Sequence, residues 1–190
     1  MIDTSQVPQD KLSDPRFLRR QAEIESALKD GRFVNSVCVH EAAHVIFYEK
    51  VGFTNPSFAK TRIVYQESQE DPFNVFMAEV KFNTENIDRE FVKGDYEINM
   101  WILAVSKAFC AGGVAARTIM QADDVGDAQD YANFLRFCEN VCAKRSNPID
   151  QNILWECAQN DVRTELKQKS LENRIWKTVR EIKPILFGSL

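Results

Sequence analysis

The chain has 190 residues, a formal net charge of -4 and a hydrophobic fraction of 44%, values typical of one soluble globular domain. A mildly acidic chain without a basic block argues against nucleic acid or an anionic membrane as its main partner. The first 14 residues carry acids and prolines where a secretory signal needs an apolar core. We therefore expect a cytoplasmic protein in which residues 1–190 form one domain and residues 1–14 are flexible.

Two helices are expected in the first 50 residues. Asp14 and Pro15 are typical of the N-cap and the first residue of a helix, which then stops at Gly31. A second helix, from about Arg32 to Lys50, is apolar almost all round. Such a composition is typical of a helix buried in the interior of a domain.

The next segment has the alternating pattern of strands. Ile63 and Tyr65 alternate with polar neighbours, and Phe73, Val75 and Met77 alternate again after the polar segment 68–72. This pattern predicts two antiparallel strands joined by a loop.

The remainder of the chain has the pattern of helices, expected over about residues 97–119, 127–145, 150–169 and 171–186. Charged residues and a glycine pair interrupt the apolar stretch 98–120, so we expect a buried helix there and no membrane span. The fold class predicted from these patterns is mainly α (α+β), with a small antiparallel β-sheet.

The second helix carries a metal-binding motif, His40-Glu41-Ala42-Ala43-His44. Residues four apart lie on one face of a helix, so both imidazoles can reach one ion while Glu41 lies beside them. Zinc suits this arrangement, because a catalytic zinc site keeps one position for water and a neighbouring carboxylate can accept the proton of that water.

The motif is specific because the chain contains two histidines in all, and both belong to it. Two histidines placed at random would form this HExxH pattern about once in a thousand chains. The alternative is a satisfied polar cluster without metal in a buried helix, yet such groups need partners, which a metal supplies directly.

A catalytic zinc needs a third protein ligand, which cannot be another histidine of this chain. The best carboxylates are Asp127 and Asp130, which head the apolar stripe of the helix predicted after Gly126. An acid there is costly unless it is paired or binds a metal, and Asp127 also suits a purely electrostatic role at the helix N-terminus. Periodicity does not choose between the two acids.

The five cysteines are scattered without a CxxC pair, which predicts free thiols in a reducing cytosol. Cys138 and Cys142 lie on the same stripe as the two acids. We expect both to be small core residues and not ligands.

These motifs resemble the peptidase domain of FtsH-type AAA+ zinc metalloproteases, over about residues 33–186. The matching features are the metal helix, the Gly112-Gly113 pair followed by Ala115-Ala116, and the segment from Gly126 to Asp130. The resemblance implies a zincin-like helical domain in which His40, His44 and Asp130 hold zinc, with Asp130 and not Asp127 as the third ligand. Glu41 would be the general base.

The chain also departs from that family. Ala43 replaces a usual glycine, Arg117 and Thr118 replace an acidic pair, and no GxxxxGK[ST] phosphate loop occurs. We therefore expect an ATP-independent metallopeptidase that acts on unstructured polypeptides or peptides, without nucleic acid or membrane partners.

Related peptidases pair extended substrate with a strand beside the metal helix. Here the candidate strand carries Phe73, Val75 and Met77, within the segment Phe73–Val80. Two alternatives remain open: a metal-binding interaction module that keeps the fold without cleaving, and a zinc hydrolase that acts on non-peptide substrates.

Overall fold

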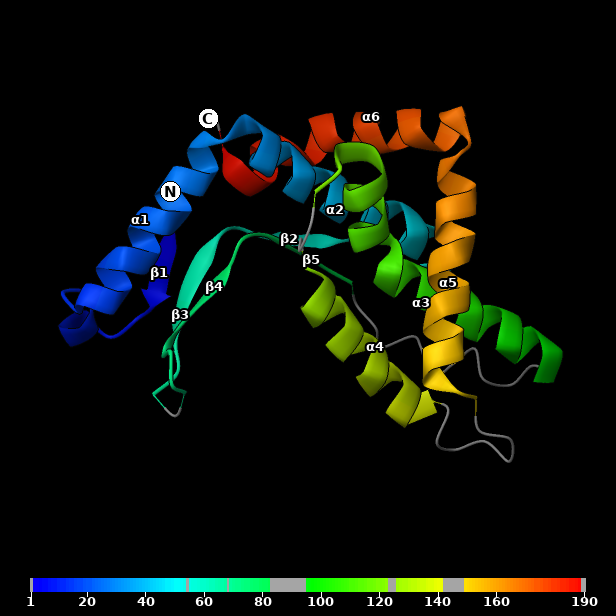
Figure 1. The fold of residues 1–190 in the computed structure, drawn as a ribbon, viewed down its shortest axis with the longest axis horizontal. Coiled ribbons are helices and arrows are strands. Elements are labelled where there is room, and N and C mark those ends of the chain that lie inside the picture. The colour runs from blue at the N-terminus through cyan, green and yellow to red at the C-terminus, as the bar shows by residue number, and fades with distance from the viewer. Residues whose placement is uncertain are drawn as a thin grey trace.

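A computed structural model describes residues 2–53, 55–67, 69–82, 95–122, 126–141 and 149–188. The fold is mainly α with a small amount of sheet, which confirms the predicted class. The described residues form six α-helices, with α2 at the centre, and five short strands that lie on one side of α2 (Figure 1). The predicted break at residues 146–148 and the position of Cys142 lie outside the described residues.

One aspartate, Asp30, lies at the junction of the first two helices. Helix α1 (Pro15–Lys29) begins with Asp14, whose side chain accepts the Arg16 N–H, and with Pro15 at its first position. Asp30 then ends α1 through its own N–H and caps α2 (Gly31–Lys50) by accepting the Arg32 N–H. The sequence pattern predicts the stop at Gly31; the structure makes Gly31 the first residue of α2, because Asp30 does both capping tasks.

Helix α2 forms the centre of the protein. Most of its residues from Val34 to Phe47 are buried, as its all-round apolar sequence predicts. It packs mainly against α3 (Asp95–Ala115) and α6 (Lys169–Phe187), which cover two of its sides. Any polar side chain on this stretch of α2 therefore lies inside the molecule.

The remaining helices pack mainly against α3. After α3 the chain continues through a π-helix, η3 (Ala116–Met120), and then forms α4 (Asp127–Val141) and α5 (Gln151–Leu166). The stretch Ile98–Met120 is long and apolar enough to span a membrane, a property it shares with core helices of soluble proteins. Here that stretch packs against α2, α4 and α5.

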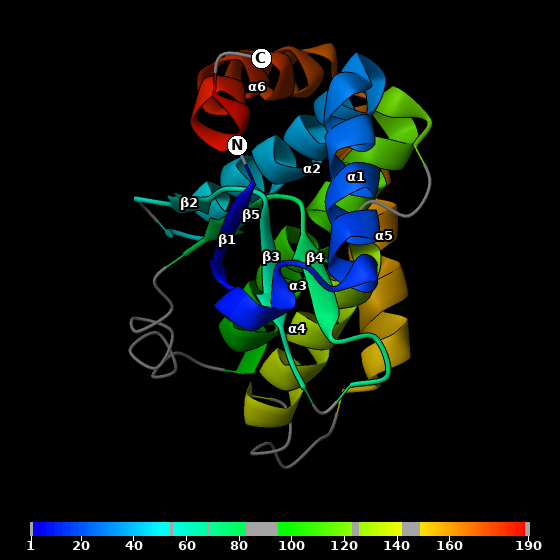
Figure 2. The ribbon, with the colours of Figure 1, turned by 90° about the vertical axis from the view of Figure 1, so that its left-hand side faces the viewer.

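The antiparallel pair predicted around residues 68–72 is present, but the strands do not form the single antiparallel sheet that the sequence predicts. One sheet has the order β1–β3–β4, with β1 (Asp3–Gln6) parallel to β3 (Arg62–Tyr65), and β3 antiparallel to β4 (Phe73–Phe76). A separate antiparallel pair joins β2 (Ser57–Ala59) to β5 (Glu79–Lys81). Figure 2 shows β1, β3 and β4 side by side, next to α1.

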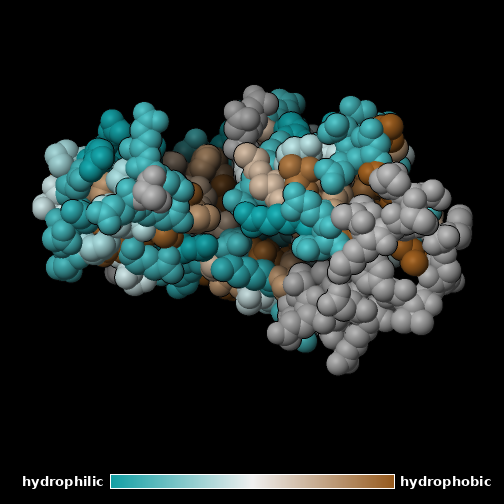
Figure 3. All heavy atoms as spheres, turned by 90° about the horizontal axis from the view of Figure 1, so that it is seen from below, coloured by the Kyte–Doolittle hydropathy of each residue, from teal (hydrophilic) through white to brown (hydrophobic). Residues whose placement is uncertain are grey.

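The segment expected to be flexible, residues 1–14, contains regular structure. Asp3–Gln6 is the strand β1, and a 3-10 turn (η1, Gln9–Lys11) leads from it to α1. Strand β1 is polar and held mainly by backbone hydrogen bonds, so its sequence has no hydrophobic alternation to reveal it. Helix α1 and the three-stranded sheet form a lobe beside the other helices (Figure 1). In the view of Figure 3, apolar side chains are visible between this lobe and the other helices.

Candidate metal centre

Helix α2 brings His40, Glu41 and His44 together in the interior. Their exposed fractions are 4%, 6% and 6%. Three polar side chains buried to this degree require partners, because a buried polar group without a hydrogen bond or a bound ion destabilises the fold.

The ring of His44 is oriented by the backbone of α3. Its Nδ1 lies 2.8 Å from the carbonyl oxygen of Ala108, so Nδ1 donates to that oxygen and Nε2 faces the interior. The Nε2 atoms of His44 and His40 are 3.0 Å apart. Both ring nitrogens therefore point at the same spot.

Asp130 reaches this spot from the first turn of α4. Its Oδ2 lies 3.2 Å from His40 Nε2 and 3.2 Å from His44 Nε2. The turn is started by Gly126, which has φ +74 and whose carbonyl oxygen accepts the Asp130 N–H. The structure thus brings together His40, His44 and Asp130, the three residues predicted to hold a metal, with their ligand atoms within 4.8 Å of one another.

Asp127, the other carboxylate considered, lies elsewhere. It forms an ion pair with Arg117 of η3 and packs against Gly113 of α3. Cys138 lies in an apolar cluster with Phe134 and Phe137 and is not part of the metal-binding group.

The three ligand atoms fit a small tetrahedral metal. Their mutual distances are 3.0, 3.2 and 3.2 Å. In a tetrahedral site with metal–ligand bonds of about 2.0 Å, neighbouring ligand atoms are about 3.3 Å apart. Two imidazole nitrogens with one carboxylate also suit zinc or another transition metal better than calcium or magnesium, which take oxygen ligands.

The charge balance of the cluster also favours a cation. Burial alone would lower the pKa of His44, but the Asp130 carboxylate and the hydrogen bonds to Asp130 and Ala108 raise it to about 9. Burial opposes ionisation of Asp130, yet the two histidines hold the pKa of its carboxyl below the usual range. When no metal is bound, a proton on His44 supplies the positive charge that a metal cation would otherwise supply beside Asp130.

Glu41 lies beside the three ligands and belongs to a different set of contacts. Its Oε2 accepts the Val80 N–H of β5 at 2.9 Å, while its Oε1 lies 3.9 Å from His40 Nε2. Burial raises the pKa of Glu41, and the two histidines and the Val80 N–H only partly oppose this effect. A buried carboxylate with a raised pKa and one fixed oxygen is suited to accept a proton.

Two glycines make room for the imidazoles of His40 and His44. A Cβ at Gly112 of α3 would lie 2.6 Å from His40 Nε2 and closer still to His44 Nε2. A Cβ at Gly126 would lie 2.6 Å from His40 Cε1. The backbones of α3 and of the turn before α4 therefore approach the imidazoles as closely as only glycine allows.

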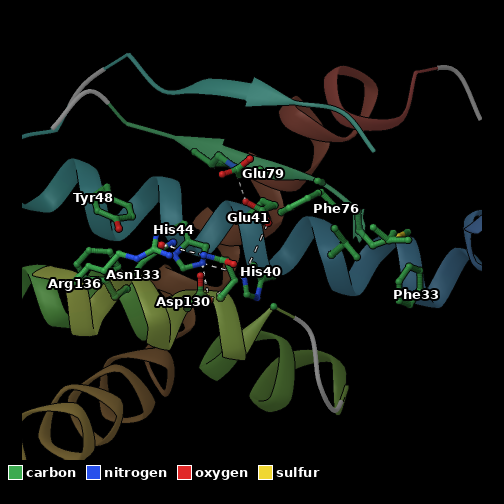
Figure 4. Close-up of a pocket in the computed structure, with 18 residues that line it drawn as sticks. Phe33, His40, Glu41, His44, Tyr48, Phe76, Glu79, Asp130, Asn133 and Arg136 are labelled. Carbon is green, nitrogen blue, oxygen red and sulfur yellow. Dashed lines mark hydrogen bonds and ion pairs between the residues drawn. The ribbon is translucent and has the colours of Figure 1, made fainter. Parts of the chain in front are cut away.

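A cleft of about 560 Å³ opens above the metal centre and runs along α2. Figure 4 shows β5 on one side of it and α4 on the other, with the metal-binding group near the middle. Phe33 and Phe76 lie toward one end, and Tyr48, Asn133 and Arg136 toward the other.

Only part of the predicted substrate strand lines the cleft. Val75 and Met77 line the cleft, but Phe73 is buried in a separate cluster with Phe17 and Ile63. Strand β5, which follows this segment, is the one that contacts Glu41. The chain turns at residues 77–78 from the first sheet into the second, and the sequence pattern does not mark that change.

The contacts of Gly112, Gly126 and Val80 could not be identified from the sequence. The two glycines were visible in the sequence as part of a family resemblance, but their contacts with the imidazoles follow only from the packing. The contribution of Val80 is a backbone N–H, which leaves no mark on the sequence.

Comparisons of the chain with protein-family models, with curated proteins and with solved structures found no match.

Proposed function

We propose that this protein is a zinc-dependent metallopeptidase. The observation that carries the proposal is the buried triangle of His40, His44 and Asp130 with the Glu41 carboxylate directly beside it. A structural zinc site is closed by four protein ligands, whereas three ligands next to a base suit a site that activates water.

Bound zinc would polarise the scissile carbonyl group and lower the pKa of water at the site. Glu41 accepts one proton from the attacking water as the water oxygen bonds to the carbonyl carbon. The same carboxylate delivers that proton to the leaving amine as the C–N bond breaks, so one water is consumed and a carboxylic acid and an amine are formed. The Val80 N–H keeps Oε2 of Glu41 in place and leaves Oε1 on the side of the metal-binding group.

The shape of the cleft supports an extended polypeptide as substrate. Strand β5 pairs with β2 along one edge, and its other edge faces α2 and the cleft, because the Val80 N–H points to Glu41. Because the Val80 N–H is taken by Glu41, an extended chain that adds to this edge would donate to the Val80 carbonyl oxygen, which points to the same side. This geometry agrees with the resemblance of the sequence to FtsH-type peptidase domains and with a preference for unstructured chains.

The test combines metal analysis with a cleavage assay on the purified protein. We expect about one zinc per chain, and cleavage of casein or of a library of unstructured peptides that stops when a chelator removes the metal and returns when zinc is added. A fully zinc-loaded protein that cleaves no peptide would contradict the proposal and favour a metal-binding interaction module. Cleavage of ester or amide model substrates without any peptide cleavage would instead indicate a hydrolase of another class.

A further inference from the structure

The end of the cleft that carries Arg136 differs in charge from the rest. Gln129, Asp130, Asn133 and Arg136 lie on one face of α4, and all four line the cleft. Arg136 lies six residues after the ligand Asp130, which corresponds to about 9 Å along the helix.

The acidic side chains that line the cleft already have partners. Glu79 forms ion pairs with Arg62 at 2.7 Å and with Lys81 at 3.4 Å. Asp130 lies against the two histidines, and Glu41 accepts the Val80 N–H.

Arg136 is the exception. It is exposed and forms no ion pair within the described part of the chain. A guanidinium that has no acidic partner among the described residues, at the end of the cleft, is a ready partner for a carboxylate, which it can bind through two parallel hydrogen bonds.

The surroundings of Arg136 strengthen such an interaction. Tyr48 and Phe109 line the same end of the cleft, and the Tyr48 ring packs against Phe109 and stacks on Phe82. A charge pair next to aromatic side chains is less screened by water than one on an open surface.

The direction of β5 decides which side of the scissile bond faces Arg136. From Phe76 to Glu79 the chain runs toward the Tyr48 end of the cleft (Figure 4). A substrate paired antiparallel to β5, the more stable arrangement, would have its N-terminal part at that end. The rise of about 9 Å along α4 from the backbone of Asp130 to that of Arg136 corresponds to about three extended residues.

We infer that the cleft selects peptides with an acidic side chain two or three residues on the N-terminal side of the scissile bond, and that Arg136 is the residue that binds it. This inference rests on the proposed function, because it assigns a substrate preference to the same site. A carboxylate could also come from the C-terminus of a peptide, but only if the chain lay parallel to β5.

The experiment uses one peptide that the wild-type protein cleaves. Its second or its third residue on the N-terminal side of the scissile bond is replaced by Glu, Gln or Lys. We expect Glu to exceed Gln by about three- to tenfold in kcat/KM, mainly through KM, which is the range of a partly screened ion pair. Arg136→Gln should remove the preference, and Arg136→Glu should turn it toward Lys. Amidating the C-terminus of the peptide should change nothing; a loss on amidation would show that Arg136 binds a terminal carboxylate instead and would overturn the assignment.

A matched control separates a local contact from a change in net charge. Arg180 is exposed on α6 and does not line the cleft, so Arg180→Glu should leave the order of the three peptides unchanged. If Arg180→Glu shifts the order as much as Arg136→Glu does, the preference is a long-range charge effect and the inference is wrong.

A second readout does not depend on turnover. Binding of the fluorescently labelled Glu and Lys peptides to the Glu41→Gln variant should differ by the same factor, and Arg136→Gln should abolish the difference. Equal or undetectable binding of the two peptides would overturn the inference. If the wild type cleaves no peptide, the same binding comparison is made with unstructured peptides that carry one Glu or one Lys; a preference for Glu that Arg136→Gln abolishes would then show that Arg136 binds the acidic side chain although the proposed peptidase activity fails.

Discussion

Replacing Gly112 by alanine tests whether α3 is shaped to fit the metal ligands. The new Cβ would lie 2.6 Å from His40 Nε2, whereas ordinary contacts begin at 3.4 Å. The His40 ring would have to move by about 0.8 Å, and the His44 ring by slightly more, because the Cβ is closer to its Nε2. A functional metal site tolerates deviations of only about 0.2 Å in its ligand distances.

A shift of this size is several times larger than the metal centre can absorb. We therefore expect Gly112→Ala to weaken zinc binding by about 100-fold or more, the upper end of the effect of disturbing the groups that orient metal ligands. The fold should survive, because an overpacked side chain costs about 1–3 kcal/mol while alanine in a helix is worth about 1 kcal/mol more than glycine. The assay is a competition titration with a chromophoric chelator, together with the Tm of the metal-free protein.

Gly31→Ala is the matched control for this substitution. Gly31 opens α2, and no atom lies within 4 Å of the position that a Cβ would take there. Alanine at this position should therefore leave zinc affinity unchanged and stability equal or slightly higher. Wild-type zinc affinity in Gly112→Ala would refute the reasoning, as would an equal loss in Gly31→Ala.

Three further outcomes are expected. In the same titration, Asp130→Asn should lose most of the zinc affinity. Asp127→Asn should keep nearly all of it, because Asp127 pairs with Arg117. The reverse order would show that Asp130 is not the third ligand. Hydrogen bonds to Arg16 lower the pKa of Asp14 to about 2, so its ionised cap stabilises α1 above the ordinary pKa near 4 and loses most of this effect as the pH falls to 2. About half of the Asp14 carboxyl is still ionised at pH 2, so Asp14→Ala should lower the Tm much more at pH 7 than at pH 2; an equal effect at both would contradict the capping role. A folded protein should resist cleavage, whereas the same protein in its unfolded form should be cleaved. ATP should change neither result. Cleavage maps by mass spectrometry, recorded with and without ATP, check both expectations.

The cluster of His40, Glu41 and His44 on α2 could be predicted from the sequence because its signal is local. The histidines His40 and His44 are four residues apart on one helix, so helical geometry alone places them on one face. Asp130 is 86 residues beyond His44, and periodicity could not separate it from Asp127. The choice between them depends on the turn at Gly126 and on the pairing of Asp127 with Arg117, which are properties of the packed structure.

The helices were predictable for a similar reason, and so was the antiparallel pair β3 and β4, whereas β1 and β2 were not. Helices α1 and α2 follow from caps and apolar faces that lie within their own sequences. Strands β1 and β2 are three or four residues long and at most half-buried, so no alternation marks them. Their pairing partners lie far along the chain, and backbone hydrogen bonds to those partners define them.

We propose that Glu41 acts on a substrate at the candidate metal centre without holding the metal. The most direct measurement is the zinc content and the rate of peptide cleavage of Glu41→Gln beside the wild type. We expect equal zinc content and a turnover lower by about two to four powers of ten, because an amide cannot accept the proton of water. Loss of zinc together with activity would show that Glu41 is a ligand, and unchanged turnover at full zinc occupancy would contradict its role as the base.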